Sequence, residues 1–173
     1  MRIAMTLLAV ALLSCACSTT TILEQKENRV GSLTSADEYM LRPITVSFKA
    51  PPEWGASNEQ WDAWVALWRQ EFESELRARC RKTLTNTALE SSPRRGYVVE
   101  CDVYDMNSGG FAGVGGRGYA RGQLLVRDVD SGTVLYDGKI EGTATSQTKA
   151  ADRLTAAVGD LASGVAIILM QGG

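Results

Sequence analysis

The sequence predicts an α+β fold, a two-layer sandwich in which two helices cover one face of a mostly antiparallel four-stranded sheet. Two long segments repeat apolar residues every three or four positions, which is the period of a helix with one buried side. Four segments alternate apolar and polar residues, which is the period of a strand. The predicted order is β-α-β-β-β-α, so the last three strands can pair as consecutive neighbours.

Four segments are expected to be strands, at residues 44–48, 97–104, 119–129 and 133–145. In the second of them, YVVECDVY, Cys101 falls on the apolar side. Glu100, Asp102 and Tyr104 fall on the other side, away from the predicted helices. We therefore expect these three side chains to form a solvated surface that is available to a partner protein.

Two segments are expected to be helices. Ser57 is followed three residues later by Gln60, the spacing of a capping box, so a long helix is predicted from residue 58 to residue 85. The final helix is predicted over residues 149–170. Its last part, residues 161–170, is apolar but too short to span a bilayer, and it is interpreted as a buried helix end.

The first residues have the pattern of an export signal. Arg2 supplies a positive start, and residues 3–13 form an apolar run that is too short for a membrane-spanning helix. The motif Leu12-Leu13-Ser14-Cys15 resembles the bacterial lipobox, which has an aliphatic residue three positions before a cysteine and a small residue directly before it. In such signals the cysteine thiol receives a diacylglycerol and the cysteine becomes the new N-terminus. We therefore expect lipidation at Cys15.

Cys17 is the alternative lipidation site, because Ala16 is acceptable before it although Ser14 fits the aliphatic position poorly. A cleaved secretory signal without lipid is the third interpretation. Several acyl chains at Cys15 would anchor the chain firmly, since each buried CH₂ contributes about 0.8 kcal/mol. Ala16, rather than an aspartate, favours the outer membrane by analogy with lipoprotein sorting. The expected organisation is a signal peptide at 1–14, a lipidated N-terminus and flexible tether at 15–42, and a periplasmic α+β domain at 43–173.

The composition argues against several classes of function. The net charge is −2, so no basic surface is available for nucleic acid. The chain has no histidine, which excludes Ser-His-Asp and Cys-His catalysis and most catalytic zinc sites. We expect no enzyme activity, no cofactor and no metal site. Glu100, Asp102 and Asp105 are the strongest catalytic candidates if an activity exists.

Two cysteines are expected in the interface between the long helix and the sheet. Cys80 lies on the apolar stripe of the predicted helix, and Cys101 lies on the apolar side of its strand. In the oxidising periplasm a disulfide between them would close a loop of about twenty residues and contribute about 3 kcal/mol. The alternative is two buried free thiols that act as small apolar side chains.

Residues 107–118 hold six glycines in twelve positions. A strand and not a helix is predicted to follow them, so they lack the context of a phosphate-binding loop. We expect a flexible connection between two strands, in which Phe111 and Arg117 are candidates for contact with a partner.

Four tryptophans fall within fifteen residues, at Trp54, Trp61, Trp64 and Trp68. Three of them share the apolar stripe of the long helix, so packing in the core is expected. An exposed aromatic patch is the alternative. A pocket lined by these rings between helix and sheet would instead make the protein a carrier of lipid or another small ligand.

Three segments carry a resemblance to a known group of proteins: YVVECDVYDM, the hairpin GQLLVRDVDSGTVLYDGKIEG, and KAADRLTAAVGDLA at the start of the final helix. Together with the lipobox they resemble the small bacterial lipoproteins of the 4410-type domain-of-unknown-function group, which is similar to periplasmic modules of curli-secretion and transport-auxiliary lipoproteins. The resemblance covers roughly residues 44–170. It implies no catalytic residues and an envelope component that binds or assembles.

Together these patterns predict an outer-membrane lipoprotein that acts as a non-catalytic binding or accessory subunit of an envelope assembly. Its expected partners are the membrane, through the lipid, and an envelope protein. An exposed sheet edge is a second place where a partner strand could bind. A carrier with a tryptophan-lined pocket is the alternative.

Overall fold

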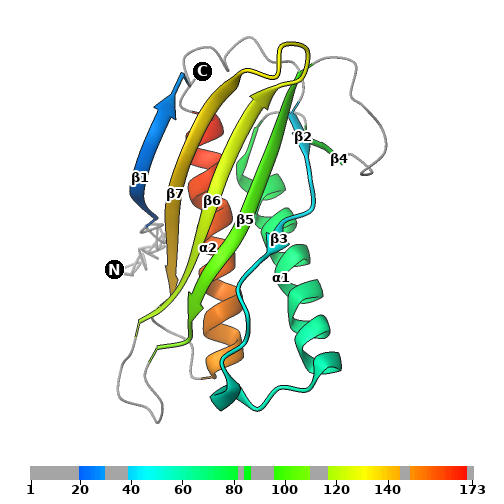
Figure 1. The fold of residues 1–173 in the computed structure, drawn as a ribbon, viewed down its shortest axis with the longest axis vertical. Coiled ribbons are helices and arrows are strands. Elements are labelled where there is room, and N and C mark those ends of the chain that lie inside the picture. Colours follow the sequence, from blue (N-terminus) through cyan, green and yellow to red (C-terminus); the bar gives the residue numbers. More distant parts are fainter. Residues whose placement is uncertain are drawn as a thin grey trace, which may run out of the picture.

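The fold consists of one sheet with two helices packed on one of its faces (Figure 1). The helices are α1 (Asn58–Arg79) and α2 (Ala150–Met170). The strands are β1 (Thr21–Asn28), β2 (Tyr39–Leu41), β3 (Thr45–Val46), β4 (Leu84–Asn86), β5 (Tyr97–Asn107), β6 (Gly118–Asp128) and β7 (Val134–Ala144). The computed structural model describes residues 20–29, 39–81, 84–86, 96–109, 117–144 and 149–170.

The sheet has seven strands and is mixed. Its order is β1-β7-β6-β5-β2-β4, and β3 pairs with β5 beyond the end of β2. The three long strands β5, β6 and β7 form the expected antiparallel meander, and β1 adds to β7, also antiparallel. The α+β class and the two helices on one face are therefore confirmed. The prediction of a four-stranded, mostly antiparallel sheet is wrong, because β2, β3 and β4 pair in parallel.

Two of the additional strands lie within residues 15–42, which the sequence predicts to be a tether. β1 forms one edge of the sheet and is largely exposed along its length. β2 is the opposite case, because all three of its residues, Tyr39, Met40 and Leu41, are buried. Part of the predicted tether therefore belongs to the folded domain, which begins before residue 43.

The helix α1 begins as predicted. Its N-cap Ser57 accepts a hydrogen bond from the backbone nitrogen of Gln60, and the Gln60 side chain accepts one from the backbone nitrogen of Ser57. The helix ends at Arg79, six residues before the predicted end, because Cys80 adopts an extended conformation. The chain then forms β4, which pairs with β2. Residues 82–83 and 87–95 lie outside the described residues.

The helix α2 is the centre of the core. It packs on β6 and β7 and also on α1, and most of its residues are buried. Gly142 of β7 permits this close packing, because a Cβ there would lie 2.2 Å from the backbone nitrogen of Leu161. By length and composition α2 could cross a membrane, but most of its apolar stretch is buried within the fold.

The expected disulfide between Cys80 and Cys101 is absent. Both cysteines are buried and both are free. The alternative interpretation, two buried free thiols, describes this structure.

Candidate functional site

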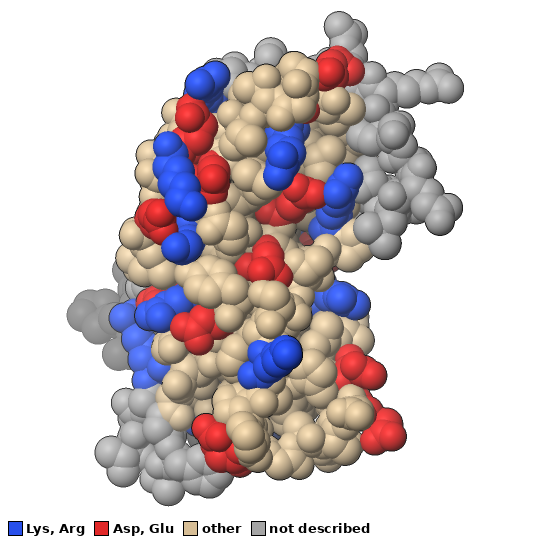
Figure 2. Space-filling model, viewed as in Figure 1, with Lys and Arg blue, Asp and Glu red and all other residues tan. Residues whose placement is uncertain are grey.

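The face of the sheet opposite the helices carries a dense array of charged and polar side chains. We call it the open face. Burial alternates along the three long strands, so every second residue points to this face. Acidic and basic side chains are interspersed across it (Figure 2). The open face is defined by Glu100, Asp102, Tyr104, Asp105, Tyr119, Arg121, Gln123, Leu125, Arg127, Asp137, Lys139 and Glu141.

Arg121 joins three strands in the middle of the open face. Its guanidinium donates to Asp105 of β5 at 3.0 Å and to Glu141 of β7 at 2.7 Å. The register brings these residues together, because Arg121 is paired with Asp105 on one side and with Glu141 on the other. The guanidinium also lies over the Tyr119 ring, 4.3 Å from its centroid. The hydrogen bond to Glu141 is the main reason that the pKa of Arg121 is raised.

A second ion-pair cluster surrounds Glu100. Arg42, in the segment between β2 and β3, donates to Glu100 at 2.6 Å, and Arg127 of β6 approaches its other oxygen at 3.4 Å. One carboxylate is thus shared by two guanidinium groups. These three residues line a surface hollow of about 500 Å³, whose other lining residues are Val98, Asp128, Val129 and Gly132.

Asp128, at the rim of this hollow, is engaged in the turn after β6. Its Oδ1 atom accepts hydrogen bonds from the Ser131 backbone nitrogen at 2.7 Å and from the Ser131 hydroxyl at 2.8 Å. These bonds lower the pKa of Asp128. Its carboxylate therefore holds the hairpin turn.

Asp102 connects β5 to the neighbouring segment. Both of its carboxylate oxygens accept hydrogen bonds at 2.6 Å, one from the Thr45 hydroxyl and the other from the Ser47 hydroxyl. Asp102 therefore fixes β3 and the residue after it against β5.

Beyond β6 the polar array continues to the β1 edge. Gln123 donates a hydrogen bond to Asp137 of β7. Lys139 contacts Glu24 of β1 at 2.5 Å, and this contact lowers the pKa of Glu24 and raises that of Lys139. Tyr104 lies near Lys139 and Arg121, and burial is the largest cause of its raised pKa. The open face is therefore cross-linked by polar contacts from β1 to the segment before β3.

The residues predicted for partner contact are only partly brought together. Glu100, Asp102 and Tyr104 share the open face, as the alternation along β5 predicts. Arg117 is exposed and lies just before β6, at the opposite end of the meander from Glu100. Phe111 lies outside the described residues, as do Cys15 and Cys17.

Sequence reasoning missed the basic half of the open face, namely Arg42, Arg121, Arg127 and Lys139. For the three on β6 and β7 a signal was available, because they alternate with buried residues in the predicted strands. No such signal exists for Arg42, which reaches Glu100 only because β2 pairs with β5.

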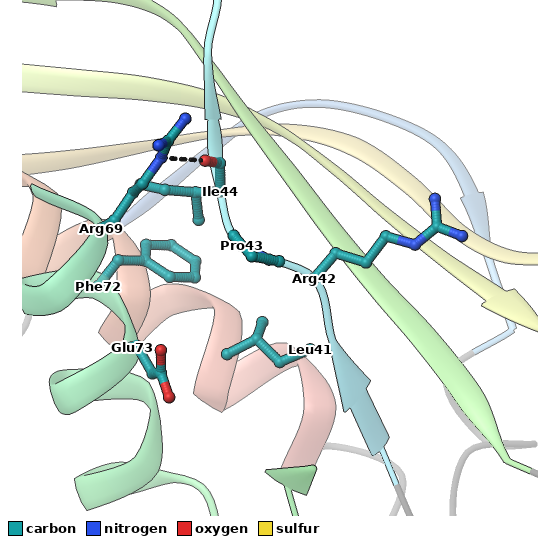
Figure 3. Close-up of a pocket in the computed structure, with 7 residues that line it drawn as sticks. All are labelled: Leu41, Arg42, Pro43, Ile44, Arg69, Phe72 and Glu73. Carbon is teal, nitrogen blue, oxygen red and sulfur yellow. Dashed lines mark hydrogen bonds between the residues drawn. The ribbon is translucent and has the colours of Figure 1, made fainter. Parts of the chain in front are cut away.

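The helix layer contains a second, smaller cavity of about 70 Å³ between α1 and the segment that joins β2 to β3 (Figure 3). Arg69 closes one side by donating to the Ile44 carbonyl at 3.1 Å, while the Arg42 side chain points away from α1. This cavity is large enough for a few water molecules at most. Its lining residues are Leu41, Arg42, Pro43, Ile44, Arg69, Phe72 and Glu73.

The four tryptophans and Phe48 form one cluster of aromatic rings in contact. Trp61 and Trp68 meet edge to face at 5.5 Å, and Trp54 meets Trp64 in the same way at 6.2 Å. Trp68 is buried, and the other three are partly buried. Neither of the two cavities described above is lined by a tryptophan. In the described part of the chain these rings pack against one another and against Phe48.

No protein-family model and no curated protein matches the sequence. Solved structures do resemble it. The hypothetical protein CT253 from Chlamydia trachomatis is 9% identical, with a TM-score of 0.50, over 79% of this chain and 99% of that chain. The PelC dodecamer from Paraburkholderia phytofirmans is 16% identical, with a TM-score of 0.47, over 83% and 95%. Lipoprotein GNA1162 from Neisseria meningitidis is 11% identical, with a TM-score of 0.37, over 74% and 94%.

At these identities the likeness concerns the fold alone. CT253 supports the arrangement of one sheet and two helices over nearly its whole length. The resemblance to the 4410-type group stays a prediction, since no family model matches.

Proposed function

We propose that this chain is a lipid-anchored protein of the bacterial envelope that binds a partner protein through its open face and performs no catalysis. The observation that carries the proposal is the asymmetry of the sheet. Both helices cover one face, whereas the other presents paired charges from β1 to the segment before β3. Charged side chains on such a surface can set the register and the choice of partner when the charges of the partner complement them.

The hollow around Glu100 is the proposed centre of the contact. Arg42 donates a hydrogen bond to the Glu100 carboxylate, and Arg127 forms an ion pair with its other oxygen, so one carboxylate is shared by two guanidinium groups. The other carboxylate at the rim, Asp128, keeps its negative charge, but it accepts its hydrogen bonds from Ser131 and forms no ion pair with either arginine among the described residues. A carboxylate side chain of the partner would complete the pairing, and arginine is well suited to such planar contacts.

The anchor belongs to the same proposal and rests on the lipobox at Cys15. It is tested by intact-mass measurement of the mature N-terminus in wild type and in Cys15→Ser. We expect the wild type to begin at an acylated Cys15 and the variant to lose acylation. The matched control is Cys17→Ser, which should remain acylated. Acylation that survives Cys15→Ser would contradict the assignment.

Partner binding is tested by photo-crosslinking in the intact envelope. A benzophenone amino acid replaces Leu125 on the open face or, as control, Gln70 on the exposed side of α1. We expect a defined protein adduct from position 125 and none from position 70. Charge reversal by Arg127→Glu should abolish the adduct, whereas Arg79→Glu on α1 should leave it. Adducts from position 70 alone would overturn the proposal.

A further inference from the structure

The described residues expose four large apolar side chains, and three of them lie near the start of β1. Ile22 and Leu23 are 46% and 44% exposed, and Ile167 of α2 is 43% exposed. The fourth, Leu67, lies on α1 and is 46% exposed. Exposed apolar side chains that gather in one place indicate a contact surface more strongly than single ones do.

Thr20 ties the start of β1 to the turn of α2 that precedes Ile167. Its hydroxyl donates to the Asp160 carbonyl at 2.9 Å. The Thr20 side chain packs where residue 164 has no side chain. A Cβ atom added to Gly164 would lie 2.1 Å from the Thr20 Cγ2 atom. Ile167 follows Gly164 by three residues, so it lies on the same side of α2, about 4.5 Å farther along the axis. We call Ile22, Leu23 and Ile167 the apolar corner.

The length of the chain before Thr20 limits how far this corner can lie from an anchor. Five Cα-to-Cα steps lead from Cys15 to Thr20, and a fully extended chain spans at most about 3.5 Å per step, or about 17 Å. β5, β6 and β7 each have eleven residues, or about 36 Å at the rise of a strand. The anchor can therefore reach the bilayer only from the side of the domain where β1 begins.

We propose that the apolar corner rests on the bilayer that holds the acyl chains of Cys15, so that the domain lies with the start of β1 against the lipid surface. The inference rests on the lipid anchor of the proposed function. Burial of the three side chains among lipid headgroups and acyl chains stabilises one orientation of the domain. The short distance from Cys15 holds the corner at the surface, so this small apolar area need not bind lipid by itself.

The experiment uses the full-length lipidated protein in vesicles of phosphatidylethanolamine and phosphatidylglycerol. A benzophenone amino acid replaces Leu23, Ile167 or, as a control of matched exposure, Leu67. Irradiation is followed by mass spectrometry for protein–lipid adducts. We expect lipid adducts at positions 23 and 167 and none at position 67. A ten-residue Gly-Ser insertion between residues 18 and 19 should reduce the adducts at 23 and 167 while the protein still floats with vesicles.

Flotation separates the two ways in which the proposal can fail. If the protein floats but positions 23 and 167 give no more lipid adduct than position 67, the anchor stands and the orientation is wrong. Adducts to a second protein chain at 23 and 167, in place of lipid, also overturn the orientation. If the protein does not float, the anchor itself is absent and both proposals fail.

Discussion

The two buried cysteines, Cys80 and Cys101, illustrate how a single residue's surroundings set its chemistry. Both lie in the core between helices and sheet. Burial raises the pKa of Cys101 to about 12, and the nearby charge of Asp102 contributes to the same shift. The thiolate is the reactive form of cysteine, so this thiol is inert in the folded protein.

Thiol labelling therefore depends on unfolding. In a Cys17→Ser background we expect Cys80 and Cys101 to resist iodoacetamide at pH 8 in the folded state. Both should react fully in urea, with and without a reducing agent. Mass spectrometry of the alkylated protein measures the result. Labelling in urea only after reduction would show that the two thiols form a disulfide.

Glu71 of α1 is held against α2, where its Oε1 atom would lie 3.1 Å from a Cβ on Gly159. Burial raises the pKa of Glu71, and the neighbouring charge of Glu75 adds to the shift. A raised carboxyl pKa means that the folded state favours the protonated form. The contribution of Glu71 to stability is therefore most favourable below the pKa of the unfolded chain and falls as the pH rises through the raised value.

We expect Glu71→Gln to stabilise the protein at pH 7 by a few tenths of a kcal/mol, because the group is only partly buried and solvent screens it. The gain over wild type should shrink at pH 4, where Glu71 itself is largely protonated. Urea denaturation at both pH values measures the difference. The control is Asp62→Asn on the exposed side of the same helix. An equal gain at both pH values would contradict this assignment.

At the scale of elements, the contact between α2 and β7 is set by Gly142. A Cβ there would lie 2.2 Å from the Leu161 nitrogen and 2.4 Å from the Ala157 carbonyl oxygen. Both are backbone atoms, so a side-chain rotation cannot relieve the contact and the whole helix must shift.

We expect Gly142→Ala to destabilise the protein by about 3 kcal/mol or more, at the upper end for overpacking. Gly132→Ala is the matched control. Its φ is +68°, but no atom lies within 4 Å of its Cβ position, so only the backbone preference of about 1–2 kcal/mol is lost. Urea denaturation compares the two. A smaller loss at 142 than at 132 would show that α2 is free to move away from β7.

The elements that the sequence predicted well are the long ones. β5, β6, β7 and α2 match their predicted ranges to within a few residues, because each presents one buried side over many residues. The strand β1 was missed because it is exposed on both faces and has no apolar alternation. β2 and β4 have three residues each, which is too few to show any period. Leu84 continues the spacing of α1, which is why the helix was predicted to run too far.

The candidate site could be predicted from the sequence only where residues alternate along one long strand. Alternation along one strand places Glu100, Asp102 and Tyr104 together. Their partners come from other strands, so Arg42 and Arg121 could not be assigned to them until pairing and register were established. The basic half of the open face is thus a property of the folded sheet.

At the scale of the whole molecule, β1 decides whether the N-terminal segment is a tether or part of the domain. It pairs with β7 along its length and covers that edge of the sheet. Removing a tether would leave the stability of the domain unchanged. Removing an edge strand instead leaves the backbone hydrogen-bonding groups of β7 unpaired and exposed, which favours aggregation.

We therefore compare two truncated proteins, one starting at residue 20 and one at residue 30. The first should unfold at the temperature of the full domain. The second should unfold about 10 °C lower and aggregate more readily, since a loss of a few kcal/mol shifts the midpoint by this amount. Circular dichroism during heating measures both. Equal midpoints would show that β1 contributes nothing to stability.

The place of β1 in the sheet also bears on the order of events in the export that the proposed function requires. β1 is the first strand of the chain, but the elements that receive it, β7 and α2, are the last. In a chain that crosses the inner membrane with its N-terminus leading, β1 has no docking site until the C-terminal third has followed. We expect the enzymes that acylate and cut the leader to act in this interval, with no folded domain beside them. In the lipid-anchored protein proposed above, docking of β1 would then complete the domain after the anchor is attached.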